Sequence, residues 1–125
     1  MIADTTFVAD FLRERAAGRA GAASRFAAAH RAEKSRTTII TAGEVAVGLA
    51  RPEEIWGALQ RWTIYRLHPG IGEAAARLDR QLLRAGGRLG ENDNWIAGFA
   101  LYYREPLVSR DTDFDRVPGL RRVAY

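Results

Sequence analysis

Short apolar runs alternate along the chain with longer segments in which apolar residues recur at helical spacing. Ile2-Ala3 is followed by Asp4-Thr5-Thr6, which predicts the end of a buried strand and then a helix capped by an Asp or Thr side chain. Residues 37–40 are all Thr or Ile, so they predict a second buried strand. Three further runs complete the predicted strands: residues 63–67, 107–109 and 122–125.

The segments between these strands predict helices. Residues 71–84 have the clearest amphipathic pattern, and Gly86-Gly87 ends it. Pro52, with two glutamates after it, predicts the start of another helix, because proline and acidic residues favour the first turn. A further helix is predicted from residue 91 to Pro106. Strands that alternate with helices favour an α/β fold, with a parallel sheet covered on both faces, in a single domain over residues 1–125.

The composition excludes several kinds of site. The chain has no cysteine, and its two histidines, His30 and His68, lie in different segments. These facts exclude a disulfide scaffold and a cysteine-ligated zinc or iron–sulfur site, and they provide no paired-histidine motif. No apolar run is long enough to span a membrane, and no basic segment leads into a long apolar one at the start. We therefore expect a soluble cytoplasmic protein.

The charge balance is basic, with 19 Lys and Arg against 15 Asp and Glu, a formal net charge of +4. Such a balance is compatible with an anionic partner. Residues 13–36 carry seven of the basic side chains and two acidic ones, and Gly18 and Gly21 predict a break there between two helices. We interpret this stretch as a solvated helical hairpin. A polyanion-binding surface is the alternative.

Acidic residues follow predicted strands or begin predicted helices at four places: Asp4, Glu44, Asp93 and Asp111. In a parallel sheet such positions lie at the carboxyl edge, where ligands bind. Each acid also has a local explanation. Asp4 is a candidate helix cap, Glu44 completes a capping box that begins at Thr41, Asp93 suits the helix dipole, and Asp111 suits a turn.

Four carboxylates in one crevice would repel one another, and each would raise the pKa of the others. Such a cluster is tolerated when it is protonated or neutralised by a cation. Because no cysteine or histidine lies near these acids in sequence, ligation by oxygen alone points to Mg²⁺ or Mn²⁺. Either ion can polarise a phosphodiester and lower the pKa of an attacking water.

The chain also resembles the PIN domain family, and within it the VapC-type toxin ribonucleases of bacterial toxin–antitoxin pairs. The resemblance runs nearly from end to end and depends on an ordered set of short motifs. These are IADTT at residues 2–6, TAGEV at 41–45, ENDNWIA at 91–97, LVSRDTDF at 107–114 and RVPGL at 116–120.

This resemblance implies a three-layer α/β/α sandwich with a mostly parallel sheet, and a metal-dependent endoribonuclease. It assigns Mg²⁺ or Mn²⁺ ligation and catalysis to Asp4, Glu44, Asp93 and Asp111. It assigns supporting roles to Asp113, Thr6 and Ser109, where the family often has Thr at the last of these positions. From their closeness in sequence to the acids, Arg13, Arg15 and Arg110 are candidates to hold RNA phosphates.

The resemblance further implies an antitoxin partner that blocks the active-site groove, and a homodimer. We predict that residues 16–36 form part of that groove, and that the helix around Trp56 and Trp62 forms the dimer contact. Two alternatives stay open. One is a PIN-like module that binds RNA or protein without catalysis. The other is a receiver-like or phosphatase-like domain, which Lys34, the only lysine, disfavours because it falls in a predicted helix.

Overall fold

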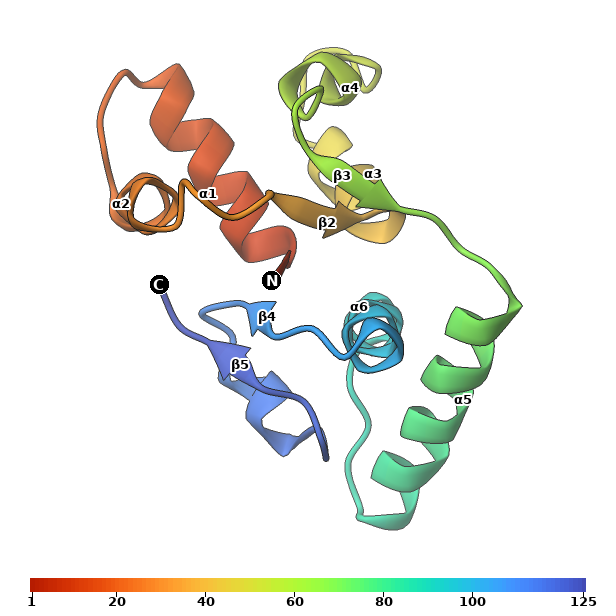
Figure 1. The fold of residues 1–125 in the computed structure, drawn as a ribbon. Helices are drawn as coiled ribbons and strands as arrows, with labels where there is room; N and C mark the ends of the chain where they lie inside the picture. Colours follow the sequence, from red (N-terminus) through yellow and green to blue (C-terminus); the bar gives the residue numbers. More distant parts are fainter.

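The computed structural model describes residues 1–125, and its centre is a sheet of five short parallel strands in the order β3-β2-β1-β4-β5 (Figure 1). The strands are β1 (Ile2–Ala3), β2 (Arg36–Thr38), β3 (Thr63–Tyr65), β4 (Leu107–Val108) and β5 (Arg122–Val123). Each strand pairs in parallel with its neighbours. The predicted parallel sheet is therefore confirmed.

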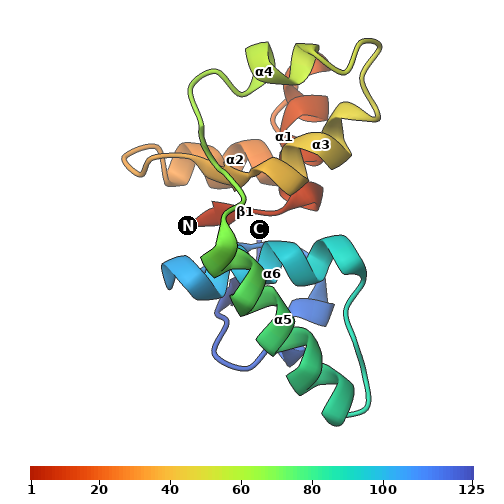
Figure 2. The same cartoon turned by 90° about the vertical axis from the view of Figure 1, so that its right-hand side faces the viewer.

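Helices cover both faces of this sheet (Figures 1 and 2). On one face lie α1 (Thr5–Ala16), α2 (Ala22–Ala29), α3 (Ile39–Ala46) and α4 (Glu54–Ala58), and on the other lie α5 (Pro69–Arg84) and α6 (Glu91–Tyr103). A short 3₁₀ helix, η1 (Thr112–Arg116), links β4 to β5. The three-layer α/β/α arrangement is confirmed. None of the helices has both the length and the apolar character that a membrane crossing requires.

Each face of the sheet has its own hydrophobic core. Ile2 and Leu107 are register partners and are fully buried against α5 and α6. Their neighbours Ala3 and Val108, also register partners, lie in the core under α1 and α3. Because successive side chains of a strand point to opposite faces, two-residue strands are enough to serve both cores.

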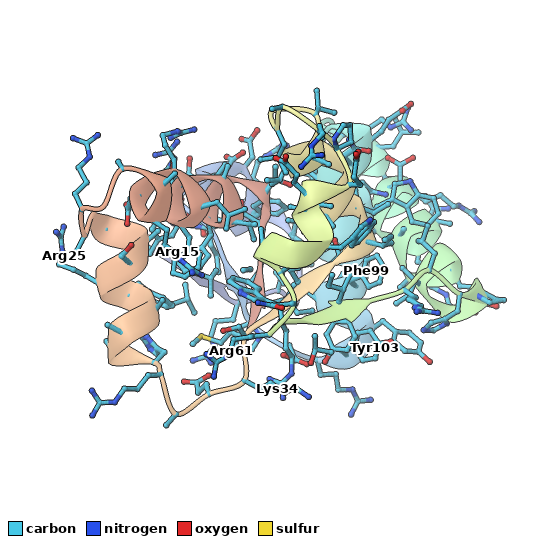
Figure 3. The ribbon with its side chains drawn as sticks, turned by 90° about the horizontal axis from the view of Figure 1, so that it is seen from above. Arg15, Arg25, Lys34, Arg61, Phe99 and Tyr103 are labelled. Carbon is cyan, nitrogen blue, oxygen red and sulfur yellow. The ribbon has the colours of Figure 1, made fainter.

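The most extensive helix contact joins α5 to α6. Gly98 is buried in α6, and a Cβ added there would lie 3.0 Å from the Cβ of Ala75 and 3.2 Å from its backbone. Phe99, the next residue, is fully buried in the same core and lies inside the molecule (Figure 3). Phe99 packs α6 against Ile2 and Leu107 of the sheet, and Asn92 in its first turn contacts Glu44 on α3.

Several predicted boundaries are wrong. The strand predicted over residues 37–40 ends at Thr38, and α3 begins at Ile39. The reason is local, since the Thr38 hydroxyl accepts a hydrogen bond from the backbone N–H of Thr41 at 3.1 Å and so caps the helix. Thr41 is therefore inside the helix and is not its cap. Likewise, the strand predicted over residues 63–67 ends at Tyr65.

Two helix ends also differ from prediction. The helix predicted after Pro52 is shorter than its apolar pattern suggested, because it spans only Glu54–Ala58 and leaves Trp62 beyond its end. The last helix ends at Tyr103, before Pro106, because Arg104 adopts the left-handed conformation (φ 54°) and its N–H bonds to the carbonyls of Ala100 and Leu101. By contrast, the predicted break near Gly18 is confirmed, since α1 ends and α2 begins on either side of it.

Candidate active site

Asp4 follows β1 directly and caps α1. One carboxylate oxygen accepts from the backbone N–H of Phe7 at 2.8 Å, and the Thr6 hydroxyl donates at 2.9 Å. The Ser109 hydroxyl, at the end of β4, donates to the other carboxylate oxygen at 2.5 Å. Asp4 is only 2% exposed. The sequence IADTT therefore places a buried carboxylate at the carboxyl edge of the sheet, with two hydroxyls fixing its orientation.

Burial raises the pKa of Asp4 above its ordinary value. The hydrogen bonds from Ser109, Phe7 and Thr6 lower the pKa in part, and the negative charge of Asp111 raises it. The hydroxyl bonds therefore help to keep a buried carboxylate in its charged form. This is the form that a cation would bind.

Glu44 lies on α3 and connects the beginnings of two other helices. The Thr5 hydroxyl donates to one of its carboxylate oxygens, and the side-chain amide of Asn92 donates to the other at 2.8 Å. Thr5 follows Asp4, and Asn92 precedes Asp93, so Glu44 joins the α1 and α6 ends of the site. The interpretation of Glu44 as part of a capping box with Thr41 is wrong, because Thr38 caps this helix.

Asp93 lies in the first turn of α6 and is partly buried. Burial raises its pKa from the ordinary 3.8 to about 6. Four further carboxylates add to the rise through their negative charge: Asp111, Glu44, Asp4 and Asp113. Acids from three other segments of the chain therefore act electrostatically on this one carboxylate.

Asp111 and Asp113 follow β4. Asp111 caps η1, because its carboxylate accepts from the backbone N–H of Asp113 at 2.8 Å. The Ser109 hydroxyl, which donates to Asp4, also accepts from the backbone N–H of Asp111 at 2.9 Å. Ser109 thus connects the β1 and β4 acids. Asp113 is exposed and lies 3.8 Å from the guanidinium of Arg116.

The donor set fits a hard divalent cation by its chemistry, because every candidate ligand is a carboxylate oxygen and the mutual repulsion of the carboxylates favours a cation. In the present positions of the side chains, no three of these acids lie close enough together to hold one metal ion. In these positions each oxygen of Glu44 already accepts a hydrogen bond, one from Thr5 and the other from Asn92.

The three predicted phosphate-binding arginines do not contact these four acids. Arg13 and Arg110 both pair with Asp10, at 2.7 Å and 2.8 Å. Arg15 lies over the ring of Phe11, 5.8 Å from its centre, on the α1–α2 side of the molecule (Figure 3). The structure therefore brings two of these arginines together and separates the third from them.

The structure also places four residues in or beside the site that had no predicted role in it. Thr5 and Asn92 were each a neighbour of a predicted acid, and that adjacency was the only available signal. Asp10 and Tyr125 had no signal, because the phenol of Tyr125 donates to Asp10 at 2.9 Å across almost the whole length of the chain. The same phenol lies 3.4 Å from the hydroxyl of Thr6.

Lys34 lies in the loop between α2 and β2, and the prediction that it falls in a helix is wrong, because α2 ends at Ala29. It lines a hollow together with Met1 and Arg36, at the amino ends of β1 and β2. The acids lie at the opposite ends of these strands. No lysine therefore stands beside them, as a receiver-like or phosphatase-like site would need.

Comparison with protein families matches residues 1–120 to the PIN domain. The chain belongs to the PIN domain family. Comparison with curated proteins gives no match.

Solved structures with the same fold as this PIN domain include three toxin–antitoxin proteins. One is VapBC2 from Rickettsia felis bound to a promoter DNA fragment, with TM-score 0.83, 18% identity, and coverage of 98% of this chain and 96% of that one. VapBC-1 from nontypeable Haemophilus influenzae has TM-score 0.77, 20% identity and coverage of 98% and 96%. A toxin–antitoxin complex from Klebsiella pneumoniae has TM-score 0.70, 25% identity and coverage of 95% and 93%.

Proposed function

We propose that this PIN domain is a Mg²⁺- or Mn²⁺-dependent endoribonuclease that acts as the toxin of a toxin–antitoxin pair. One observation carries the proposal. The pKa of Asp93 is raised to about 6, and carboxylates from three other segments contribute to that rise. Membership of the PIN family supports nuclease chemistry, and structural neighbours such as the toxin–antitoxin complex from Klebsiella pneumoniae support the toxin role.

The four acids Asp4, Glu44, Asp93 and Asp111 would hold the ion, with Asp113 as an auxiliary acid. When bound, Mg²⁺ or Mn²⁺ supplies Lewis acidity toward a phosphodiester and makes water more acidic. The chain itself positions the ligands. Thr6 and Ser109 hold the carboxylate of Asp4 through their hydroxyls, and Asp93 is carried by the first turn of α6, which packs against the sheet.

RNA is the proposed substrate because its backbone has the charge that the rest of this surface attracts. If four of the 15 acids serve the cation, 19 basic residues face 11 acidic ones, a balance of +8. A surface of this kind binds polyanions with an affinity that falls as salt rises.

We further propose an antitoxin partner that covers this edge, with residues 16–36, which contain α2, forming part of its binding groove. Three arginines that take part in none of the ion pairs of the structure, Arg19, Arg25 and Arg31, would contact it. Their joint replacement by alanine should weaken the complex, measured by calorimetry with the protein encoded beside this one. Unchanged affinity would remove the hairpin from the interface.

We also propose that two copies associate through α4. Trp56 on this helix is 51% exposed and lies next to Leu67, which is 50% exposed, around a hollow of about 710 Å³. Trp62 lines the same hollow but also packs against Phe11, with ring centres 5.8 Å apart. Light scattering should give the mass of a dimer. A monomer that persists at high concentration contradicts this.

The function is tested by incubating RNA with the purified protein in Mg²⁺ and in EDTA. Cleavage is expected in Mg²⁺ and not in EDTA. The new RNA ends should be those left when water attacks the phosphodiester. Products that end in a 2′,3′-cyclic phosphate would show attack by the ribose hydroxyl instead, and would overturn the proposed chemistry. A protein that binds RNA but leaves it intact would be the non-catalytic module, a reading that the spacing of the carboxylates also allows.

A further inference from the structure

A second polar site lies beside the acids, between α1, α2 and the end of the chain. It is a pocket of about 260 Å³ whose polar lining comes from six residues: Asp10, Arg13, Glu14, Arg19, Arg110 and Tyr125. Arg110 stands between Ser109 and Asp111 in the sequence. The pocket therefore adjoins the carboxyl edge of the sheet at the β4 acid.

One buried carboxylate organises this pocket. Asp10 is 8% exposed, and it pairs with Arg13 through one oxygen at 2.7 Å and with Arg110 through the other at 2.8 Å. The phenol of Tyr125 donates to Asp10 at 2.9 Å and lies 3.4 Å from the Thr6 hydroxyl, which in turn donates to Asp4. The contact between the two hydroxyls thus places the pocket beside the first acid of the active site.

The two arginines are anchored but remain open to solvent. The side chain of Arg13 is 69% exposed and that of Arg110 is 61% exposed, whereas the Asp10 side chain is 11% exposed. A guanidinium has five N–H donors in a fixed fork, and Asp10 engages only part of each fork. Both side chains line the same pocket, so their remaining donors suit an anion with several oxygens.

The second acid of the pocket is already engaged elsewhere. Glu14 accepts from the backbone N–H groups of Gly21, Ala23 and Ser24 at 2.7 to 3.2 Å and so caps α2. A hydrogen bond with the Ser24 side chain, together with these backbone bonds, holds the pKa of Glu14 below its ordinary value. Arg19, the third arginine of the lining, has no acidic partner among the ion pairs of the structure. The free donors in the pocket therefore belong to arginines.

We propose that this pocket binds a backbone phosphate of the RNA next to the bond that is cleaved, with Asp10 and Tyr125 as positioning residues for Arg13 and Arg110. This proposal rests on the proposed function and deepens it. The pocket volume is below the roughly 300–1,000 Å³ of pockets that enclose a whole small ligand. A short piece of a longer chain fits better, and arginine forks match phosphate oxygens in pairs.

The test measures binding of a fluorescein-labelled oligouridylate 12-mer in EDTA, by fluorescence anisotropy over a range of salt. Arg13→Ala and Arg110→Ala should each weaken binding about ten-fold, as expected for the loss of one hydrogen bond to a charged group. Each should also reduce the slope of log K against log salt by about 0.7, the value for one phosphate contact on a single strand.

The matched control is Arg51→Ala. Arg51 is 72% exposed and pairs with Glu54 at 2.8 Å with i,i+3 spacing, like Arg13 with Asp10, but it lies outside the pocket. Its removal takes away the same charge and should change binding less than two-fold. If all three variants bind the oligouridylate with the same affinity, the pocket makes no specific phosphate contact and the proposal is overturned.

The positioning role of Asp10 is tested by a double-variant cycle. In the Asp10→Asn background, Arg110→Ala should change the affinity less than three-fold, because the guanidinium is no longer held in place. A full ten-fold loss in that background would show that Asp10 positions nothing. Should Asp10→Asn fail to fold, the single arginine variants still decide the proposal, since the side chains of Arg13 and Arg110 are both exposed.

The outcomes also separate this proposal from the proposed function. A wild-type protein that cleaves RNA while the arginine variants bind like Arg51→Ala keeps the function and overturns the pocket. A protein that binds RNA through Arg13 and Arg110 but never cleaves it supports the pocket and overturns the function. Unchanged RNA affinity together with a weakened complex with the neighbouring gene product would assign the pocket to a protein partner and overturn the proposal.

Discussion

Replacing Asp93 by asparagine should stabilise the protein in the absence of divalent cations. Burial and neighbouring carboxylates raise the pKa of Asp93 in the folded state from 3.8 to about 6. An acid whose pKa is higher when folded is costly to ionise there. The penalty is absent below about pH 3.8, grows between pH 3.8 and about 6, and is complete above that range.

A rise of the pKa from 3.8 to about 6 corresponds to about 3 kcal/mol. Asp93 is only partly buried, so solvent screening reduces this to about 1.5 kcal/mol. For a chain of this length, such a gain raises the melting temperature by about 6 °C. Asparagine has nearly the same shape and carries no charge, so it removes the penalty without creating a cavity.

The assay is thermal unfolding followed by circular dichroism, in EDTA, at pH 7.5 and at pH 3.5. Asp93→Asn should melt at a higher temperature than the wild type at pH 7.5, and at nearly the same temperature at pH 3.5. Glu91→Gln is the control, because Glu91 lies in the same first turn but is exposed. Its loss should lower stability by about 0.5 kcal/mol through the helix dipole. An Asp93→Asn variant no more stable than wild type at pH 7.5 would refute the repulsion argument.

Two further predictions concern packing and the orientation of Asp4. Gly98→Ala should destabilise the protein by about 2 kcal/mol in urea unfolding, because the new Cβ would lie 3.0 Å from that of Ala75. Gly72→Ala, a helical position with nothing within 4 Å, should instead gain about 0.5 kcal/mol, and the opposite ranking would contradict the close α5–α6 contact. Ser109→Ala removes a bond that lowers the pKa of Asp4. The acid limb of the pH–rate profile for RNA cleavage should therefore move to higher pH, and an unmoved limb would mean that Ser109 has no part in charging Asp4.

Much of the fold could be predicted because its two periodicities are clear. The apolar pairs at Ile2 and Leu107 belong to strands buried on both faces, and the pattern of residues 71–84 belongs to a helix with one buried face. The boundaries of the strands and helices were harder to predict. Residues 37–40 suit a strand by composition, but the hydroxyl of Thr38 caps a helix, and Ile39 and Ile40 pack from that helix against the α5–α6 core. Local propensity gives way there to tertiary packing.

The acids of the candidate site could be predicted because the positions that cap helices are also the positions at the carboxyl edge of the sheet. Asp4 and Asp111 each cap a helix and each follow a strand, so their local and functional interpretations are not alternatives. The surrounding hydrogen bonds could not be predicted. Tyr125 reaches Asp10 only because β5 lies beside β4 in the sheet, and no local pattern in the chain records that contact.

The central claim is that the acids around Asp93 form one cation site that serves RNA cleavage. Its most direct test is the initial rate of RNA cleavage in Mg²⁺ at pH 7.5 by the wild type, Asp93→Asn and Glu91→Gln. We expect Glu91→Gln to cleave at the wild-type rate and Asp93→Asn to be at least about 100-fold slower, although we expect Asp93→Asn to be the more stable protein in EDTA. Cleavage by Asp93→Asn at the wild-type rate would contradict the claim.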